Sequence, residues 1–182
     1  MFKRSCSYYQ IREISHSGCI TMKLGILSDT HVKKIDDLPK KALKILENVD
    51  LIIHAGDYIN EELLDDLKKL GNFKGVAGNM DPQIIKDELP ETEILELNGF
   101  KIGVIHPIEG GAPYDLVDRV REKFEQVDVI VFGHSHLPMN EKIDDILIFN
   151  PGSVTGRWPA KHKTIGILEI DNAIKGKIIT LD

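Results

Sequence analysis

The first half of the chain alternates short apolar runs with stretches whose apolar residues recur at helical spacing. The apolar runs have the length of buried strands, and in residues 61–70 the leucines fall on one face of a helix that Gly71 would end. The predicted order is a strand at 24–27, a helix at 38–47, a strand at 51–54, a helix at 61–70 and a strand at 74–77. Strands that alternate with helices in this way favour parallel pairing with right-handed crossovers.

The second half of the chain is richer in predicted strands. Asn98-Gly99 lies between the segments 92–97 and 100–105 and is a strong signal for a tight antiparallel hairpin. Further along, we predict a helix at 115–124 and strands at 127–132, 146–149, 164–170 and 177–181. The pattern therefore predicts one α/β domain with more than one sheet.

The composition is that of an ordinary globular domain. The chain has 182 residues, of which 42% are hydrophobic and 29% charged, and no run approaches the ~18 apolar residues of a membrane span. Its formal net charge of −6 disfavours nucleic acid as a macromolecular partner. A small phosphate-bearing substrate is still compatible with this charge, because bound divalent cations would reverse the local field.

The N-terminal segment differs from the rest. Residues 1–21 lack the apolar run of a secretory signal and show poor periodicity, so we expect a flexible extension before a domain at 22–182. Both cysteines, Cys6 and Cys19, lie in this extension. A disulfide between them is one alternative, but we expect free thiols in a cytoplasmic protein. Any metal site in the main body must therefore use nitrogen and oxygen ligands.

Metal-competent side chains follow five of the predicted strands. They are Asp29 and His31, Asp57, Asn79, His106, and the pair His134 and His136. Ligand sites in open α/β sheets form beyond the carboxyl ends of strands, so we expect these side chains to converge. In Asp29-Thr30-His31, an extended backbone would point the first and third side chains to the same side.

Each of these motifs has a structural alternative when it is taken alone. Asp and Asn after a glycine are common turn residues, and a lone histidine at a strand end is common by chance. Gly133-His134-Ser135-His136 is harder to explain in this way, because two histidines two positions apart suit paired imidazole coordination. The structural alternative would require five coincidences of residue type and position, so the series favours a metal site.

The series Asp29-x-His31, Gly56-Asp57, Gly78-Asn79, His106 and Gly133-His134-x-His136 resembles the calcineurin-like metallophosphoesterase superfamily. More narrowly, it is similar to a small single-domain phosphodiesterase group that includes a eukaryotic retromer subunit. The resemblance spans 22–182 and includes Asn150-Pro151-Gly152-Ser153. It implies a two-sheet β-sandwich flanked by helices, in four αββα layers.

The resemblance also implies a hydrolase of small phosphate esters, with a phosphodiesterase as the first choice. By that resemblance one divalent metal ion would be held by Asp29, His31 and His136, and a second by Asn79, His106 and His134, with Asp57 bridging both. A hydroxide shared by the two ions would attack phosphorus. Mixed carboxylate and imidazole ligands suit Mn²⁺, our first choice, or Ni²⁺, Fe²⁺, Co²⁺ or Zn²⁺.

Two positions depart from the family pattern. Many relatives carry a histidine after the Gly-Asn pair that is thought to protonate the leaving group, whereas this chain has Met80. Asp81 is an alternative acid, and a turn-forming Asp before Pro82 is the competing interpretation. Pro107 stands where relatives often have glycine, and it restricts the backbone of His106.

Two other polar residues have open interpretations. His54 either supports Asp57 from behind the ligands or packs in the core. Arg157 either contacts a substrate phosphate or lies in an exposed loop, stacked on Trp158.

Two further functions compete with a phosphodiesterase. A non-catalytic protein-interaction scaffold that retains the fold and metal binding is one, as proposed for the retromer subunit. In a scaffold we would expect replaced ligand positions, whereas all seven are intact in this chain. A nuclease of the same superfamily would need a larger chain or a basic groove, and neither is evident.

Overall fold

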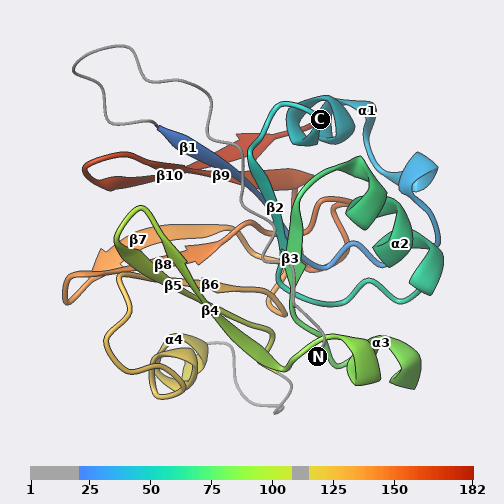
Figure 1. Cartoon of the computed structure of the whole chain (residues 1–182). Helices are drawn as coiled ribbons and strands as arrows, with labels where there is room; N and C mark the ends of the chain where they lie inside the picture. Colours follow the sequence, from blue (N-terminus) through green and yellow to red (C-terminus); the bar gives the residue numbers. More distant parts are fainter. Residues whose placement is uncertain (1–20, 108–114) are drawn as a thin grey trace, which may run out of the picture.

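The computed structural model describes residues 21–107 and 115–182, arranged as two five-stranded sheets packed against each other (Figure 1). The expected N-terminal extension falls outside the described residues except for residue 21, and so do both cysteines. The first sheet has the order β10-β9-β1-β2-β3 and the second the order β4-β5-β6-β8-β7. The expected two-sheet sandwich flanked by helices is confirmed.

The ten strands of the described residues divide equally between the two sheets. The first sheet contains β1 (Met22–Leu27), β2 (Leu51–His54), β3 (Phe73–Gly75), β9 (Thr164–Ile170) and β10 (Ile174–Thr180). The second contains β4 (Thr92–Leu97), β5 (Phe100–Ile105), β6 (Val129–Phe132), β7 (Met139–Ile143) and β8 (Ile146–Asn150). The helices are α1 (Lys40–Leu46), α2 (Glu61–Leu70), α3 (Gln83–Glu88), α4 (Leu116–Arg121) and a 3₁₀ turn at Ile35–Asp37.

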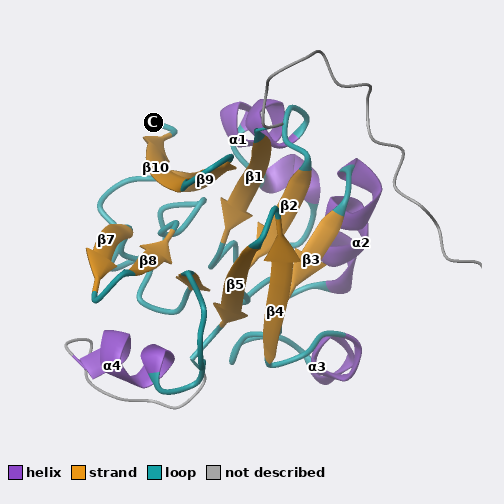
Figure 2. Ribbon diagram, turned by 60° about the vertical axis from the view of Figure 1, so that its left-hand side comes forward, coloured by secondary structure: helices purple, strands orange, loops and turns teal. Residues whose placement is uncertain are grey.

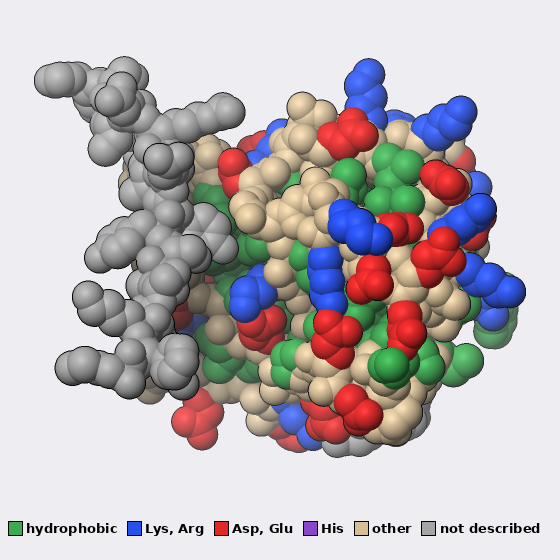
Figure 3. Space-filling view, turned by 45° about the vertical axis from the view of Figure 1, so that its right-hand side comes forward, with side chains coloured by type: hydrophobic (Ala, Val, Ile, Leu, Met, Phe, Trp, Pro, Cys, Tyr) green, Lys and Arg blue, Asp and Glu red, His purple; other side chains and the backbone are tan. Residues whose placement is uncertain are grey.

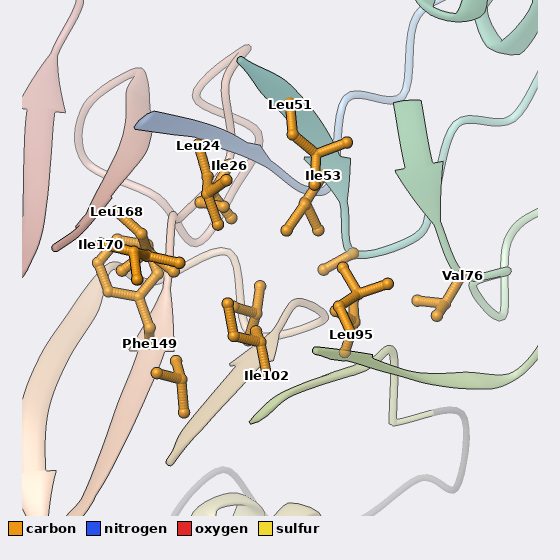
Figure 4. Packing of buried hydrophobic residues seen from close by; sticks show 14 residues of the cluster. Leu24, Ile26, Leu51, Ile53, Val76, Leu95, Ile102, Phe149, Leu168 and Ile170 are labelled. Atoms are coloured by element: carbon orange, nitrogen blue, oxygen red, sulfur yellow. The ribbon is translucent and has the colours of Figure 1, made fainter. Parts of the chain in front are cut away.

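Alternate residues of the central strands supply two different cores. Leu24 and Ile26 of β1 point into the layer between the sheets, toward Ile102 of β5 (Figure 4). Leu27 and Ile52 belong instead to the cluster packed under α1 and α2. Because these strands are buried on both faces, they appear in the sequence as continuous apolar runs and not as alternating ones.

Helices cover the outer faces of both sheets. The helices α1 and α2 lie over the first sheet, and α4 packs on the outer face of the second through Leu116 and Val120 (Figures 1 and 2). The face that turns toward the viewer in Figure 3 carries acidic and basic side chains intermixed, without a continuous basic surface. Within the described residues, no helix has the length and apolarity needed to cross a membrane.

The pairing explains how strand ends come together. The strands β1, β2 and β3 are parallel, as are β5, β6 and β8, while β9, β10, β4 and β7 pair antiparallel to their neighbours. The predicted hairpin at Asn98-Gly99 joins β4 and β5, with φ of 49° and 85° at the two turn residues. The carboxyl ends of β1 and β2 meet those of β5 and β6 at one end of the sandwich, as the contacts described below show.

Some boundaries differ from the predicted ones. The predicted helix at 115–124 is confined to Leu116–Arg121, and the strand expected at 177–181 begins earlier and ends at Thr180. The strand β7 and the helix α3 were not predicted. The sequence of β7, MNEKI, lies at an edge of its sheet with largely exposed side chains, so it lacks the apolar pattern of a central strand.

Candidate metal centre

The structure brings all seven predicted side chains together at the end of the sandwich. They form two groups on either side of Asp57. In the first group, ligand atoms of Asp29, His31, Asp57 and His136 all lie within 4.8 Å of one another. In the second group, Asn79 Oδ1 lies 3.1 Å from His106 Nε2 and 3.0 Å from His134 Nδ1.

The carboxylate of Asp57 faces both groups. Its Oδ2 lies 3.5 Å from His31 Nε2, and its Oδ1 lies 3.6 Å from His106 Nε2. The backbone N–H of Met80 also donates to Oδ1, at 2.8 Å, which fixes the plane of the carboxylate. One side chain thus presents a separate oxygen to each group of nitrogen ligands.

The hydrogen bonds of two histidines define which ring nitrogen faces the centre. His106 Nδ1 lies 2.7 Å from the carbonyl oxygen of Ala55, and His136 Nδ1 lies 2.9 Å from that of Trp158. Carbonyl oxygens only accept, so in both rings Nδ1 carries a hydrogen and Nε2 is the nitrogen that faces the centre. A backbone carbonyl that accepts the second ring N–H is the arrangement found around metal-bound histidines.

Nitrogen and oxygen atoms of the first group converge. His136 Nε2 lies 3.3 Å from Asp29 Oδ1 and 3.2 Å from His31 Nε2. Acceptor atoms repel each other at such distances unless a proton or a metal cation lies between them. The donor set is therefore chemically suited to a cation with nitrogen and oxygen ligands.

Charge and burial set the protonation of these groups. Burial lowers the pKa of His31 to about 4, and burial also lowers the pKa of His134, so both imidazoles are neutral near pH 7. Burial alone would lower the pKa of His136, but the hydrogen bond and charge of Asp29 raise it above its ordinary value. A cation that binds here would compete with protons for His136, because metal ligands must be deprotonated.

The backbone at the ligands differs from the extended form expected from the sequence. Asp29 and His31 have φ of 51° and 48°, and Asp57, His134 and His136 are also in the left-handed region. Both N–H groups of the first pair are engaged, from Asp29 to Gly56 O at 3.0 Å and from His31 to Asp57 O at 3.2 Å. Such conformations cost on the order of 1–3 kcal/mol each in non-glycine residues and concentrate at functional sites.

The absence of a side chain at residue 133 allows the two sheets to approach. A Cβ at Gly133 would lie 1.9 Å from Ser28 Oγ and 2.7 Å from the carbonyl oxygen of Ala55. The end of β6 can therefore lie against the ends of β1 and β2 only with glycine at this position. The same contact brings the His134 N–H within 3.1 Å of Asp29 Oδ2.

The segment 150–155, for which the sequence indicated no role, binds the backs of the loops that carry the proposed ligands, here called the ligand loops. Asn150 Nδ2 donates to the Gly133 carbonyl oxygen at 3.2 Å, and Ser153 Oγ donates to the Asp29 carbonyl oxygen at 2.8 Å. Thr155 Oγ1 donates to the Thr30 carbonyl oxygen at 2.9 Å. The Asn-Pro-Gly-Ser signature was visible, but its contacts depend on β8 lying beside β6, which the sequence alone does not reveal.

His54 combines the two roles that its sequence left open. It is fully buried and stacks on Tyr58 with ring centroids 3.8 Å apart. Its Nδ1 accepts from the Gly56 N–H at 3.2 Å, so Nε2 carries the hydrogen that faces Thr30 Oγ1 at 3.2 Å. Thr30 Oγ1 in turn donates to the Asp57 carbonyl oxygen at 3.1 Å. The imidazole thus supports the backbone of Asp57.

Asp81, the alternative acid, faces backbone donors. It is buried, and its carboxylate accepts from the N–H groups of Gly78, Asp57 and Ile59 at 2.7, 3.1 and 2.8 Å. Burial raises the pKa of Asp81, while these hydrogen bonds act in the opposite direction. The carboxylate connects the loops that carry Asp57 and Asn79, and its role as an acid stays a prediction.

Comparison with known proteins gives a consistent result. The model of the calcineurin-like phosphoesterase superfamily domain matches residues 22–173. A probable metallophosphoesterase of Methanocaldococcus jannaschii is 42% identical, covering 89% of this chain and 83% of that protein. A phosphodiesterase of the same organism is 31% identical, covering 82% and 94%. Among solved structures, zinc-bound Vps29 of Entamoeba histolytica has a TM-score of 0.63 at 24% identity, covering 88% and 100%, which shows the fold.

Proposed function

The chain belongs to the calcineurin-like phosphoesterase superfamily, and we propose that it is a dinuclear, metal-dependent phosphodiesterase. The observation that carries the proposal is the position of Asp57, whose two oxygens face separate groups of ligands. In this assignment Asp29, His31 and His136 bind one ion, and Asn79, His106 and His134 bind the other. Asp57 is shared between them.

The residues present favour an anionic substrate. Two divalent ions held by these residues would supply an activated water and neutralise charge on the phosphoryl oxygens. Only Asp29 and Asp57 among the seven proposed ligands carry negative charge, so two divalent cations would leave the centre positive. The carbonyls of Ala55 and Trp158 orient the rings of His106 and His136, so Nε2 of each is the nitrogen that would bind an ion. Mn²⁺ stays our first choice of metal.

The residue after Asn79 cannot protonate the leaving group. Met80 has a thioether there, which cannot donate a proton. Asp81 is engaged by three backbone N–H groups. We therefore expect phosphodiesters with acidic leaving groups, such as nitrophenols, to react much faster than dialkyl esters. A rate that is independent of the leaving-group pKa would contradict this expectation.

Metal titration of the chelated protein tests the proposal directly. We expect calorimetry to show that each chain binds two Mn²⁺ ions. Hydrolysis of bis(p-nitrophenyl) phosphate should be detected only after metal has been added. Asp57→Asn should lose at least one ion and nearly all turnover, because the shared carboxylate is removed. Asp65→Asn removes an exposed carboxylate on α2 and serves as the matched control. Near-normal turnover in Asp57→Asn would overturn the assignment.

The non-catalytic scaffold is the second candidate, because Vps29 structures share the fold. A scaffold would bind metal in the same calorimetric experiment without hydrolysing any phosphoester. Turnover that depends on both Asp57 and added metal would exclude it. A panel of mono- and diesters across Mn²⁺, Ni²⁺, Fe²⁺, Co²⁺ and Zn²⁺ would then define the preferred substrate and metal.

A further inference from the structure

The turn that follows Ser153 is fixed against the metal centre. Its first contact is the hydrogen bond from the Arg157 N–H to Ser153 Oγ at 3.0 Å, and Ala160 N–H closes the turn on the Arg157 carbonyl oxygen at 2.9 Å. His136 Nδ1–H lies 3.1 Å and 2.9 Å from the carbonyl oxygens of Arg157 and Trp158. Two consecutive peptide groups of this turn are thus anchored by a proposed metal ligand.

Trp158 is exposed although the turn that carries it is fixed. Its exposed fraction is 86%, the highest of the five exposed large apolar side chains in the described part of the chain. Fully burying an aromatic side chain removes about 150–250 Å² from water, and this chain forgoes most of that gain at Trp158. Packing of the fold does not account for an indole held in this place.

Exposed apolar side chains concentrate in the ligand loops. Of the same five, Met80 is adjacent to Asn79, and Leu137 is adjacent to His136. The backbone carbonyl of Trp158 is hydrogen-bonded to the ring of His136. Three of the five therefore lie in or against the loops that hold the metal ligands. Scattered exposed apolar residues need no explanation, but a concentration around one site indicates that the site receives an apolar group.

A cationic side chain accompanies the indole. The carbonyl oxygen of Arg157 lies 3.1 Å from His136 Nδ1, so the residue that carries the guanidinium is at the edge of the first ligand group. Arg157 is exposed and so accessible to a ligand. Guanidinium groups pair well with phosphate oxygens, and indole faces stack on planar rings.

From these observations we propose that Arg157 and Trp158 form a subsite for the ester group of the substrate, selecting phosphodiesters that carry a planar aromatic group such as a nucleobase. This inference rests on the proposed function. Arg157 contacts the phosphoryl anion at the edge of the metal centre, and the indole of Trp158 stacks on the ring. The scissile phosphate then lies at the metal ions, with the aromatic group over the turn.

The chain contains one tryptophan, so its fluorescence reports Trp158 alone. We expect thymidine 5′-monophosphate, added to the Mn²⁺-loaded protein, to change the emission saturably. Methyl phosphate should compete for the metal centre with little change in emission, and thymidine without phosphate should bind far more weakly. No emission change with the nucleotide, or the same change with methyl phosphate, would overturn the subsite.

Kinetics with two diesters of one leaving group provide the second test. Thymidine 5′-(p-nitrophenyl phosphate) and methyl p-nitrophenyl phosphate differ only in the group that stays on phosphorus. We expect Trp158→Ala to raise KM for the thymidine ester about 5- to 150-fold more than for the methyl ester, as for the loss of one stacked base. Trp158→Phe should restore much of the difference. An equal effect on both esters would contradict stacking.

The arginine has its own matched control. Arg157→Gln should raise KM for both esters, because both carry the phosphoryl anion. Lys161→Gln removes an exposed cation four positions along the chain and should change neither. Unchanged kinetics in Arg157→Gln would remove Arg157 from the subsite. Hydrolysis of both esters without dependence on Trp158 would refute the subsite alone, whereas no hydrolysis of any ester would refute the proposed function.

Discussion

The buried imidazole of His54 makes a quantitative prediction about acid stability. Burial lowers its pKa from 6.5 to about 3 in the folded chain, because a charged ring would lose its hydration, and the negative charge of Asp29 offsets only part of this effect. The pKa in the folded state is thus below that of the unfolded state. The stabilising contribution is fully present above pH 6.5 and is lost as the pH falls toward 3.

The variant His54→Asn isolates this effect, because the amide oxygen can still accept the Gly56 N–H. At pH 8 the variant loses the stacking on Tyr58 and the bond to Thr30, which we expect to cost about 1–3 kcal/mol. Below pH 6.5 the wild type loses up to ~1.4 kcal/mol per pH unit that the variant does not lose. At pH 5 the difference should therefore have shrunk by about 2 kcal/mol.

Urea unfolding of the chelated protein between pH 8 and pH 5 measures the difference, and chelation excludes a contribution from metal release. Tyr58→Phe is the control, because it removes the hydroxyl that donates to the His54 carbonyl at 3.3 Å but keeps the imidazole. Its stability profile should run parallel to the wild type. Parallel profiles for wild type and His54→Asn would refute the reasoning, since they would mean that the imidazole titrates normally in the fold.

Two further substitutions test how the ligand loops are held. Gly133→Ala places a Cβ 1.9 Å from Ser28 Oγ, so we expect a loss of about 1–3 kcal/mol in urea unfolding and weaker metal binding in calorimetry. Unchanged metal affinity would show that the loops relax without affecting the site. Asp81→Ala leaves three backbone N–H groups without their acceptor, and we expect it to lower the free energy of unfolding by about 2–5 kcal/mol. Its dependence of rate on leaving-group pKa should match the wild type; a steeper dependence in the variant would identify Asp81 as the acid.

The sequence predicted the central strands well because their burial on both faces leaves an unambiguous signal. The runs in β1 and β2 are apolar where they face either core, except at the buried His54, and the Asn98-Gly99 turn requires residues that tolerate positive φ. The edge strand β7 gave no such signal, since its side chains are largely exposed. The order of the strands within the sheets could not be predicted from the sequence, because β8 lies between β6 and β7.

The proximity of the seven proposed ligands was predictable from the sequence, but their backbone conformation was not. Their positions after strand ends placed them at one edge, and the structure brings all seven to it. The left-handed backbone of Asp29 and His31 was not predictable, since it depends on hydrogen bonds to Gly56 and Asp57 in the loop that follows β2. The role of Ser153 behind Asp29 was hidden for the same reason, because 124 positions separate them.

The ligand loops divide between the two sheets, since Asp29 follows a strand of the first and His134 follows a strand of the second, 105 positions later. Apart from these loops, the sheets meet chiefly through apolar side chains. A cation held from both sides would consequently link the two sheets at the end of the sandwich that carries these loops. During synthesis this link cannot form until residue 136 has left the ribosome and both sheets have docked. Metal uptake would then report the completion of tertiary structure in this chain, and a fragment limited to the first sheet's loops would bind ions poorly.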